Sequence, residues 1–164
     1  MSRPTVLLAA SLDWAGTARL PQAFRDAGFE VTVHAPPGLL VTQSAHADER
    51  IGAPESLAEH LAQLQRLMQT RRFDHHVACD EPLLHALAAM REQPWTHPLL
   101  PTPPQGSHLD FVVSKLIFPA TCARAALPVP ETRIHADATE LQAAAQALGF
   151  PLVAKLARGH GGLA

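Results

Sequence analysis

The beginning of the chain alternates between strand and helix patterns, and this alternation limits the fold more than any other feature of the sequence. A continuous apolar run at residues 5–10 is typical of a parallel strand that is buried on both faces. Residues 17–27 have helical spacing, with Thr17 as a candidate cap and Gly28 as the C-terminal stop. A second strand is predicted at residues 29–34, ahead of two prolines. Strand, helix and strand in this order predict a right-handed βαβ unit.

The same alternation returns further along the chain. Residues 38–52 are polar and irregular, and we expect no regular element there. Leucines then recur at helical spacing from Pro54 onward, a strand is predicted at residues 73–79, and Asp80 can cap a helix at residues 81–91. Repeated strand–helix alternation predicts an α/β fold, with a Rossmann-like parallel sheet and flanking helices.

A proline-rich segment interrupts this pattern and suggests how the chain divides into domains. Five prolines lie between Pro94 and Pro104, so we expect no regular element to run through them. We predict a Rossmann-like domain at residues 1–91, a proline-rich linker at residues 92–110 and a second domain at residues 111–164.

The second domain is predicted to begin with helices and to end with a strand. Residues 109–127 are mostly helical in composition. A further helix, capped by Asp137 or Thr139, is closed by Gly149. The apolar run that begins at Pro151 is predicted to be a strand.

Composition and charge exclude several classes of protein. The 164 residues are 47% hydrophobic with a net charge of −2, which indicates a globular chain without the basic surface that nucleic acid or an anionic membrane requires. The cysteines, Cys79 and Cys122, form neither a CxxC motif nor a secreted disulfide framework. No run is long enough for a signal peptide core or a membrane span. We therefore expect a cytoplasmic protein that binds neither nucleic acid nor membranes.

Two candidate sites in the first domain have simple structural explanations. The loop at residues 11–16 follows a strand where doubly wound sheets bind ligands, but it lacks GxGxxG, and an ordinary loop with a solvated Asp13 explains it equally well. His75, His76 and Cys79 carry atoms that suit zinc. Because adjacent strand residues point to opposite faces, surface and half-buried positions are the favoured interpretation of these three.

The end of the chain holds the strongest candidate site. Lys155 lies in the apolar run, where a desolvated ammonium is costly unless an anion accompanies it. Glycines in the next loop permit unusual backbone angles and expose amide groups that can wrap phosphate oxygens. A lysine on an edge strand and a flexible hairpin turn would explain the same residues, and the loop is not a Walker A motif. The candidate loop residues are Gly159, His160, Gly161 and Gly162.

Taken together, these segments resemble the start of an ATP-grasp enzyme. Lys115 opens a helix, the Leu-Pro-Val-Pro-Glu-Thr segment follows at residues 127–132, and Leu-Gly-Phe-Pro at residues 148–151 precedes Lys155 and the glycine-rich loop. The α/β domain in front resembles the Rossmann-like domain that commonly precedes the ATP-grasp domain. The resemblance touches the whole chain, and its specific part is the last third.

The resemblance implies an ATP-dependent reaction of the carboxylate–amine ligase kind. In the family, the lysines that match Lys115 and Lys155 bind ATP phosphates, and the glycine-rich loop closes over the β- and γ-phosphates. ATP phosphorylates a carboxylate, and an amine or another nucleophile captures the acylphosphate. Leu156 and Ala157 replace the usual Lys-Pro start, and Ala126 stands where a glycine often occurs, so the subfamily is left open.

The resemblance also implies cofactors and partners. These are ATP, Mg²⁺ and a small carboxylate substrate, with the metal ligands expected outside this chain, and a homodimer is compatible with the family. We therefore expect an N-terminal fragment with an incomplete α+β ATP-grasp lobe, inactive in isolation. The alternative is a non-catalytic α/β module that binds a small ligand or a protein. An NAD-binding Rossmann enzyme is disfavoured because GxGxxG is missing.

Overall fold

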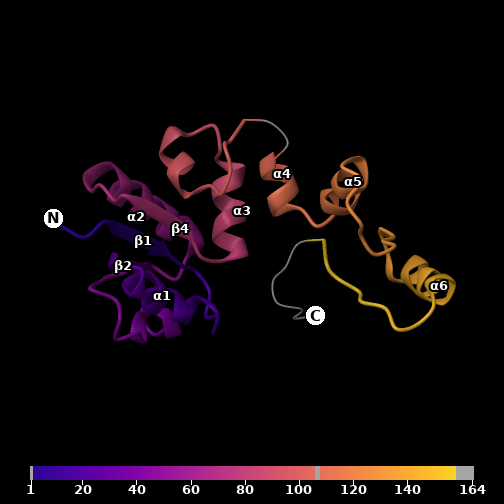
Figure 1. The fold of residues 1–164 in the computed structure, drawn as a ribbon, viewed down its shortest axis with the longest axis horizontal. Helices are drawn as coiled ribbons and strands as arrows, with labels where there is room; N and C mark the ends of the chain where they lie inside the picture. The colour runs from indigo at the N-terminus through magenta and orange to yellow at the C-terminus, as the bar shows by residue number, and fades with distance from the viewer. Residues whose placement is uncertain (1, 106–107, 158–164) are drawn as a thin grey trace. The chain divides into compact units, whose positions relative to one another are not determined.

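The computed structural model describes residues 2–105 and 108–157, and the chain divides between Leu109 and Asp110 into two compact units. Unit 1 is Met1–Leu109 and contains the sheet (Figure 1). Unit 2 is Asp110–Ala164, and its described part is helical with irregular connections. Residues 92–105, part of the predicted linker, are grouped with unit 1, while the predicted domain boundaries stay a prediction.

Four parallel strands form the sheet of unit 1, in the order β3-β2-β1-β4. The strands are β1 (Thr5–Ala9), β2 (Glu30–Ala35), β3 (Glu49–Gly52) and β4 (His75–Ala78). In the centre of the sheet, Ala9 of β1 pairs with His34 on one side and with Ala78 on the other. The predicted Rossmann-like parallel sheet is confirmed.

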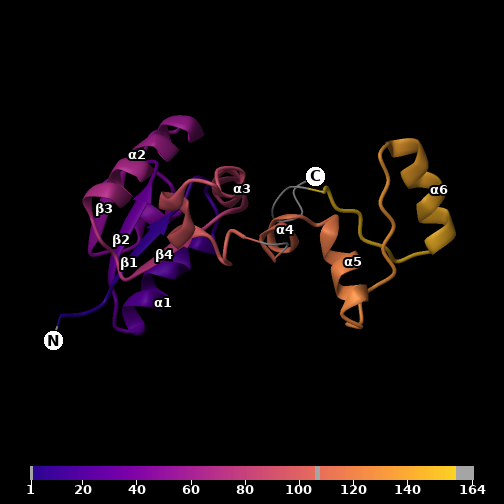
Figure 2. The ribbon, with the colours of Figure 1, turned by 90° about the horizontal axis from the view of Figure 1, so that it is seen from above.

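Helices cover both faces of this sheet. Figure 2 shows α1 (Leu20–Asp26) and α2 (Leu57–Thr70) on opposite faces. Two right-handed crossovers, β1–α1–β2 and β3–α2–β4, run in opposite directions across the sheet and so place their helices on opposite faces. On the α1 face, Val6 and Leu8 of β1 are fully buried and pack with Leu20 and Phe24. Each such side chain contributes about 1.5–3 kcal/mol through burial. The helices and short 3₁₀ turns of unit 1 are η1 (Thr17–Arg19), α1 (Leu20–Asp26), η2 (Leu40–Gln43), α2 (Leu57–Thr70), α3 (Glu81–Ala89) and η3 (Pro94–Leu99).

Three expectations about unit 1 were wrong. The segment expected to be irregular, residues 38–52, contains η2 and the edge strand β3, because pairing with β2 and not local periodicity determines this strand. Thr17 does not cap a helix; it is buried, and its hydroxyl donates to the Cys79 carbonyl at 3.4 Å. The proline-rich segment forms the 3₁₀ helix η3, in which Pro94 occupies the first position, where a missing N–H costs nothing.

The helices of unit 2 follow the predicted pattern, with α4 crossing the division between the units. They are α4 (His108–Val113), α5 (Ile117–Arg124) and α6 (Ala138–Leu148). Asp137 caps α6 by accepting the backbone N–H of Glu140 at 2.8 Å, and Gly149 ends it with φ 79°, as predicted. The predicted final strand is not formed within residues 151–157. A strand requires a paired neighbour, and no described segment of unit 2 is a strand.

The end of α5 explains one feature of the sequence. Ala126 has φ 54°, in the left-handed region that favours glycine. Its backbone N–H donates to the Ala123 carbonyl at 3.1 Å, and that of Leu127 donates to Cys122 at 3.0 Å, so the turn closes the helix. Ala126 therefore occupies a position at which glycine would be unstrained. No helix among the described residues is long and apolar enough to cross a membrane.

Candidate functional site

Lys115 lies in the turn between α4 and α5, two positions before α5 begins. The turn is held by the Ser114 carbonyl, which accepts the backbone N–H groups of Ile117 and Phe118 at 3.3 Å each. Lys115 is exposed, and the neighbouring Phe118 is 47% exposed. This turn therefore presents a long cationic side chain at the start of a helix, as the sequence predicts.

Lys155 lies in an environment different from the one we expected. It is exposed, on a stretch without regular structure, and the adjacent Leu156 is 65% exposed. The predicted strand is not formed here, and the exposure of Lys155 agrees with the alternative of a lysine that faces solvent. Without a paired strand the apolar run has no second layer to pack on, so water reaches the lysine. Burial of charge thus gives no argument for an anion beside Lys155.

The glycine-rich loop cannot be compared with its prediction. Gly159, His160, Gly161 and Gly162 lie outside the described residues. An ATP site made by this loop with Lys115 and Lys155 stays a prediction, although exposed ammonium groups suit phosphate oxygens chemically. Among the described residues, no group of three or more histidine, cysteine or acidic side chains is placed to hold a metal ion.

At the carboxyl edge of the sheet in unit 1, Asp80 joins the loop after β1 to the start of α3 by hydrogen bonds. As predicted, its side chain caps α3 by accepting the backbone N–H of Leu83 at 3.0 Å. The same carboxylate accepts the N–H groups of Ser11 and Leu12 and the Ser11 hydroxyl, the last at 2.7 Å. Sequence analysis missed this second role. The available signal was that the ends of neighbouring parallel strands meet, which places a carboxylate after β4 beside the loop after β1.

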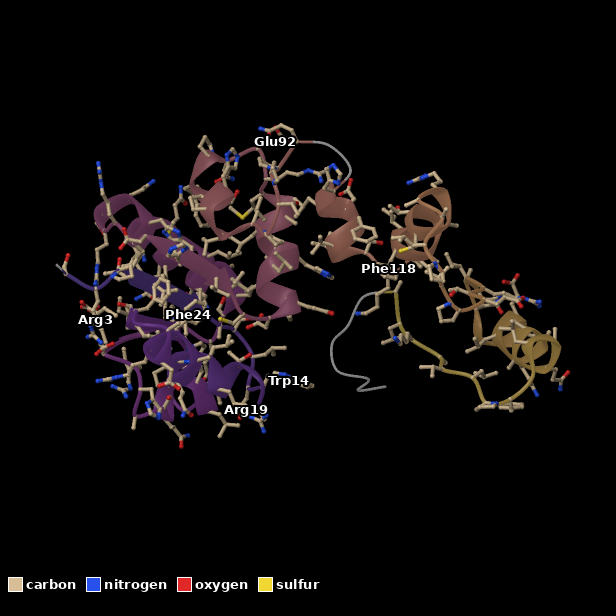
Figure 3. All side chains as sticks on the ribbon, viewed as in Figure 1. Arg3, Trp14, Arg19, Phe24, Glu92 and Phe118 are labelled. Atoms are coloured by element: carbon tan, nitrogen blue, oxygen red, sulfur yellow. The ribbon has the colours of Figure 1, made fainter. Side chains whose placement is uncertain are left out.

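This arrangement explains the loop after β1 without a ligand. The β1/β4 edge is where the strand order reverses, and open α/β sheets commonly bind ligands there. Here Asp80 already occupies the backbone donors of Ser11 and Leu12. Asp13 is not merely solvated, because it accepts the backbone N–H of Leu40 at 2.8 Å. Trp14, which is 44% exposed, and Arg19 lie at the surface of unit 1 (Figure 3).

The residues considered for zinc pack separately. The ring of His75 lies 5.1 Å from that of Phe29, and the ring of His76 lies 6.0 Å from that of Phe73, measured between centroids. Burial raises the pKa of the Cys79 thiol to about 12, so this thiol is held in its neutral form. The ring contacts of His75 and His76 and the burial of Cys79 agree with the favoured interpretation of surface and half-buried positions.

Comparison with known proteins identifies the fold. No protein-family model matches the chain, and no curated protein matches its sequence. N5-carboxyaminoimidazole ribonucleotide synthetase from Thermotoga maritima matches 95% of this chain with a TM-score of 0.60 and 20% identity. The biotin carboxylase domain of a single-chain bacterial carboxylase matches 88%, with a TM-score of 0.52 and 22% identity.

The chain has the fold of the N-terminal part of ATP-grasp enzymes. The match covers 39% of the synthetase chain and 34% of the carboxylase chain, so this chain spans little more than a third of either. The fold predicted from the sequence resemblance is thereby confirmed. It includes the α/β domain and the helical segments that follow it.

Proposed function

We propose that this chain is the N-terminal part of an ATP-grasp enzyme. In this proposal unit 1 is the Rossmann-like domain, and unit 2 begins the ATP-binding lobe. The observation that carries the proposal is the likeness of fold to the synthetase over 95% of the chain. The order of Lys115, the Pro-Val-Pro-Glu-Thr segment, Lys155 and the glycine-rich loop supports it independently, because it resembles the order of these features at the start of an ATP-grasp domain.

The surface of unit 2 also supports this proposal. Ten large apolar side chains of its described part are between 37% and 81% exposed, whereas the buried apolar residues there are only Cys122 and Ala144. Covering an exposed leucine or phenylalanine would contribute about 1.5–3 kcal/mol, so this surface favours further polypeptide packed upon it. The most exposed of these side chains are Leu127, Ile134, Phe150, Val153 and Leu156.

The proposed reaction is of the carboxylate–amine ligase kind. ATP, with Mg²⁺, would supply the phosphoryl group that activates a small carboxylate as an acylphosphate, which an amine or another nucleophile captures. Lys115 and Lys155 would neutralise charge on the phosphates. The loop at Gly159–Gly162 would exclude water from the acylphosphate. The names of the two matched enzymes refer to carboxyl groups, in keeping with this substrate class.

The proposal predicts that the 164-residue chain does not turn over ATP. Isothermal titration with Mg²⁺-ATP should give weak or no binding, and phosphate release with millimolar ATP should equal that of a buffer control. ATP-dependent turnover by this chain would contradict its assignment as an N-terminal part. If ATP binding and turnover are both absent, sequencing of the gene beyond the codon for Ala164 distinguishes such a part from a non-catalytic α/β binding module.

A further inference from the structure

Two histidines are buried between the sheet and α2. His34 of β2 is 0% exposed, and His60 of α2 is 1% exposed. Nδ1 of His34 lies 3.1 Å from Nε2 of His60, and the two rings meet edge to face with centroids 4.6 Å apart. This contact joins a strand to the helix that covers it, and neither the proposed ATP site nor the packing of α1 involves it.

The neighbours of this histidine pair determine which ring nitrogens donate a hydrogen bond and which accept one. Nε2 of Gln63 donates to the Gly52 carbonyl at 3.1 Å, which leaves Oε1 of Gln63 to accept. Nε2 of His34, at 3.4 Å from that oxygen, therefore carries a proton and donates. In a neutral His34 ring, Nδ1 then accepts, so Nε2 of His60 donates to it. When both rings are neutral, each therefore carries its proton on Nε2.

Burial opposes the charged form of both rings. It lowers the pKa of His34 to about 4, with a further contribution from His60, and the hydrogen bond to Gln63 only partly offsets these effects. Burial also lowers the pKa of His60, against the attraction of Asp80. A proton added to either ring would place a charge in the interior without an adjacent counter-ion, because no described carboxylate forms an ion pair with these rings.

Other titratable groups lie on the elements packed around the pair. On β3, Glu49 is bonded to Arg71 at 2.7 Å, and on β4 the pKa of His76 is lowered by burial and by His75. Asp80 follows β4, and on η3 Nε2 of His97 lies 2.9 Å from the Arg91 carbonyl. The neighbouring β1 residues are apolar. Of these groups, Asp80 is the charge that favours protonation of the pair, and it acts on His60.

We propose that the His34–His60 pair is an acid-sensitive latch that holds α2 on the sheet and releases it when either ring takes up a proton. Release lets the rings reach water, where a charged imidazole is stable. A proton added to Nδ1 of His34 removes the acceptor of the bond from His60, and a proton added to His60 places a charge in the buried interior. Release of α2 would also expose Leu64, a residue of this helix that is fully buried in the closed state.

The direction of the pH effect follows from proton binding. The ordinary pKa of a histidine is 6.5, and that of His34 in the folded chain is about 4, so the opened state binds more protons between these values. The latch is fully closed above pH 6.5 and weakens as the pH falls toward 4. His34 alone would raise the equilibrium constant for opening roughly 50-fold between pH 7 and pH 4.5.

Hydrogen exchange of the 164-residue chain tests the latch. After correction for the intrinsic pH dependence, protection of the α2 amides should fall roughly 50-fold between pH 7 and pH 4.5. A double variant, His34→Leu with His60→Leu, should lose most of this pH dependence, whereas His75→Gln, at an exposed position on β4, should keep it. Unchanged α2 protection in the wild-type chain, or full pH dependence in the double variant, would overturn the proposal.

A second measurement tests the latch even if the double leucine variant does not fold. Nuclear magnetic resonance of ¹⁵N-histidine in the wild-type chain reports the tautomer and titration of each ring. We expect His34 and His60 both to carry their proton on Nε2 at pH 7, His34 to stay neutral at pH 5.5, and the pKa of His60 to lie below its ordinary value. Titration of both rings near pH 6.5 with α2 still folded would contradict the latch.

Discussion

Asp80 provides a sharp test of how unit 1 is held together, because its two carboxylate oxygens have different partners. Oδ1 accepts from the backbone N–H of Leu83 at 3.0 Å and from the Ser11 hydroxyl at 2.7 Å. Oδ2 accepts the backbone N–H groups of Ser11 and Leu12. Asp80→Asn keeps the size of the side chain and one acceptor oxygen. It places an amide donor where Oδ2 accepted.

The expected loss in the free energy of unfolding follows from these contacts. Asparagine caps a helix about as well as aspartate, so the contact with Leu83 costs only a few tenths of a kcal/mol. The Ser11 and Leu12 donors lose their acceptor, at about 1 kcal/mol each for a partly buried hydrogen bond. We therefore expect Asp80→Asn to lower the free energy of unfolding of unit 1 by about 2 kcal/mol. Asp80→Ala, which also loses the cap, should lower it by about 3 kcal/mol.

Urea unfolding followed by tryptophan fluorescence measures this change, because both tryptophans, Trp14 and Trp95, lie in unit 1. Asp137 provides a matched control, since among the described residues its side chain accepts only the Glu140 N–H, the bond that caps α6. Asp137→Asn should change the circular dichroism transition of unit 2 by no more than a few tenths of a kcal/mol. An equally small effect of Asp80→Asn would refute its role in joining the loop after β1 to α3 and reduce Asp80 to a cap.

Three further predictions concern other parts of the chain. In a longer protein encoded by this gene, Lys155→Ala should abolish ATP binding, measured by calorimetry, without a change in Tm. Arg124→Ala should leave ATP binding intact. A large loss of Tm in Lys155→Ala would instead indicate a structural role for Lys155. Ala126→Gly should stabilise unit 2 by about 1 kcal/mol in chemical unfolding because φ is 54° there, whereas Ala125→Gly, at φ −86°, should not stabilise it. Leu64→Ala should cost about 2–5 kcal/mol of unit 1 stability by fluorescence, since Leu64 is fully buried, and a cost below 1 kcal/mol would contradict its place in the core.

Local signals explain what the sequence predicted correctly. The apolar run of β1 must be buried on both faces wherever it lies, so its pattern alone identifies a central parallel strand. Asp80 and Asp137 cap helices through contacts three residues away, which a single sequence reveals. Gly149 likewise ends α6 through its own backbone conformation.

The features that escaped prediction depend on residues distant in the chain. β3 is four residues long, and only its register with β2 makes it a strand. The exposure of Lys155 depends on whether another strand pairs with its segment, which the segment itself cannot reveal. The His34–His60 contact joins positions 26 residues apart. Its one local signal was that His60 shares the apolar side of α2 with Leu64, four residues later.

The central claim is that this chain is the N-terminal part of an ATP-grasp ligase. The most direct measurement is the DNA sequence beyond the codon for Ala164. The account predicts an open reading frame that continues with further strands and with acidic and asparagine residues able to hold Mg²⁺. A stop codon immediately after Ala164 would contradict it.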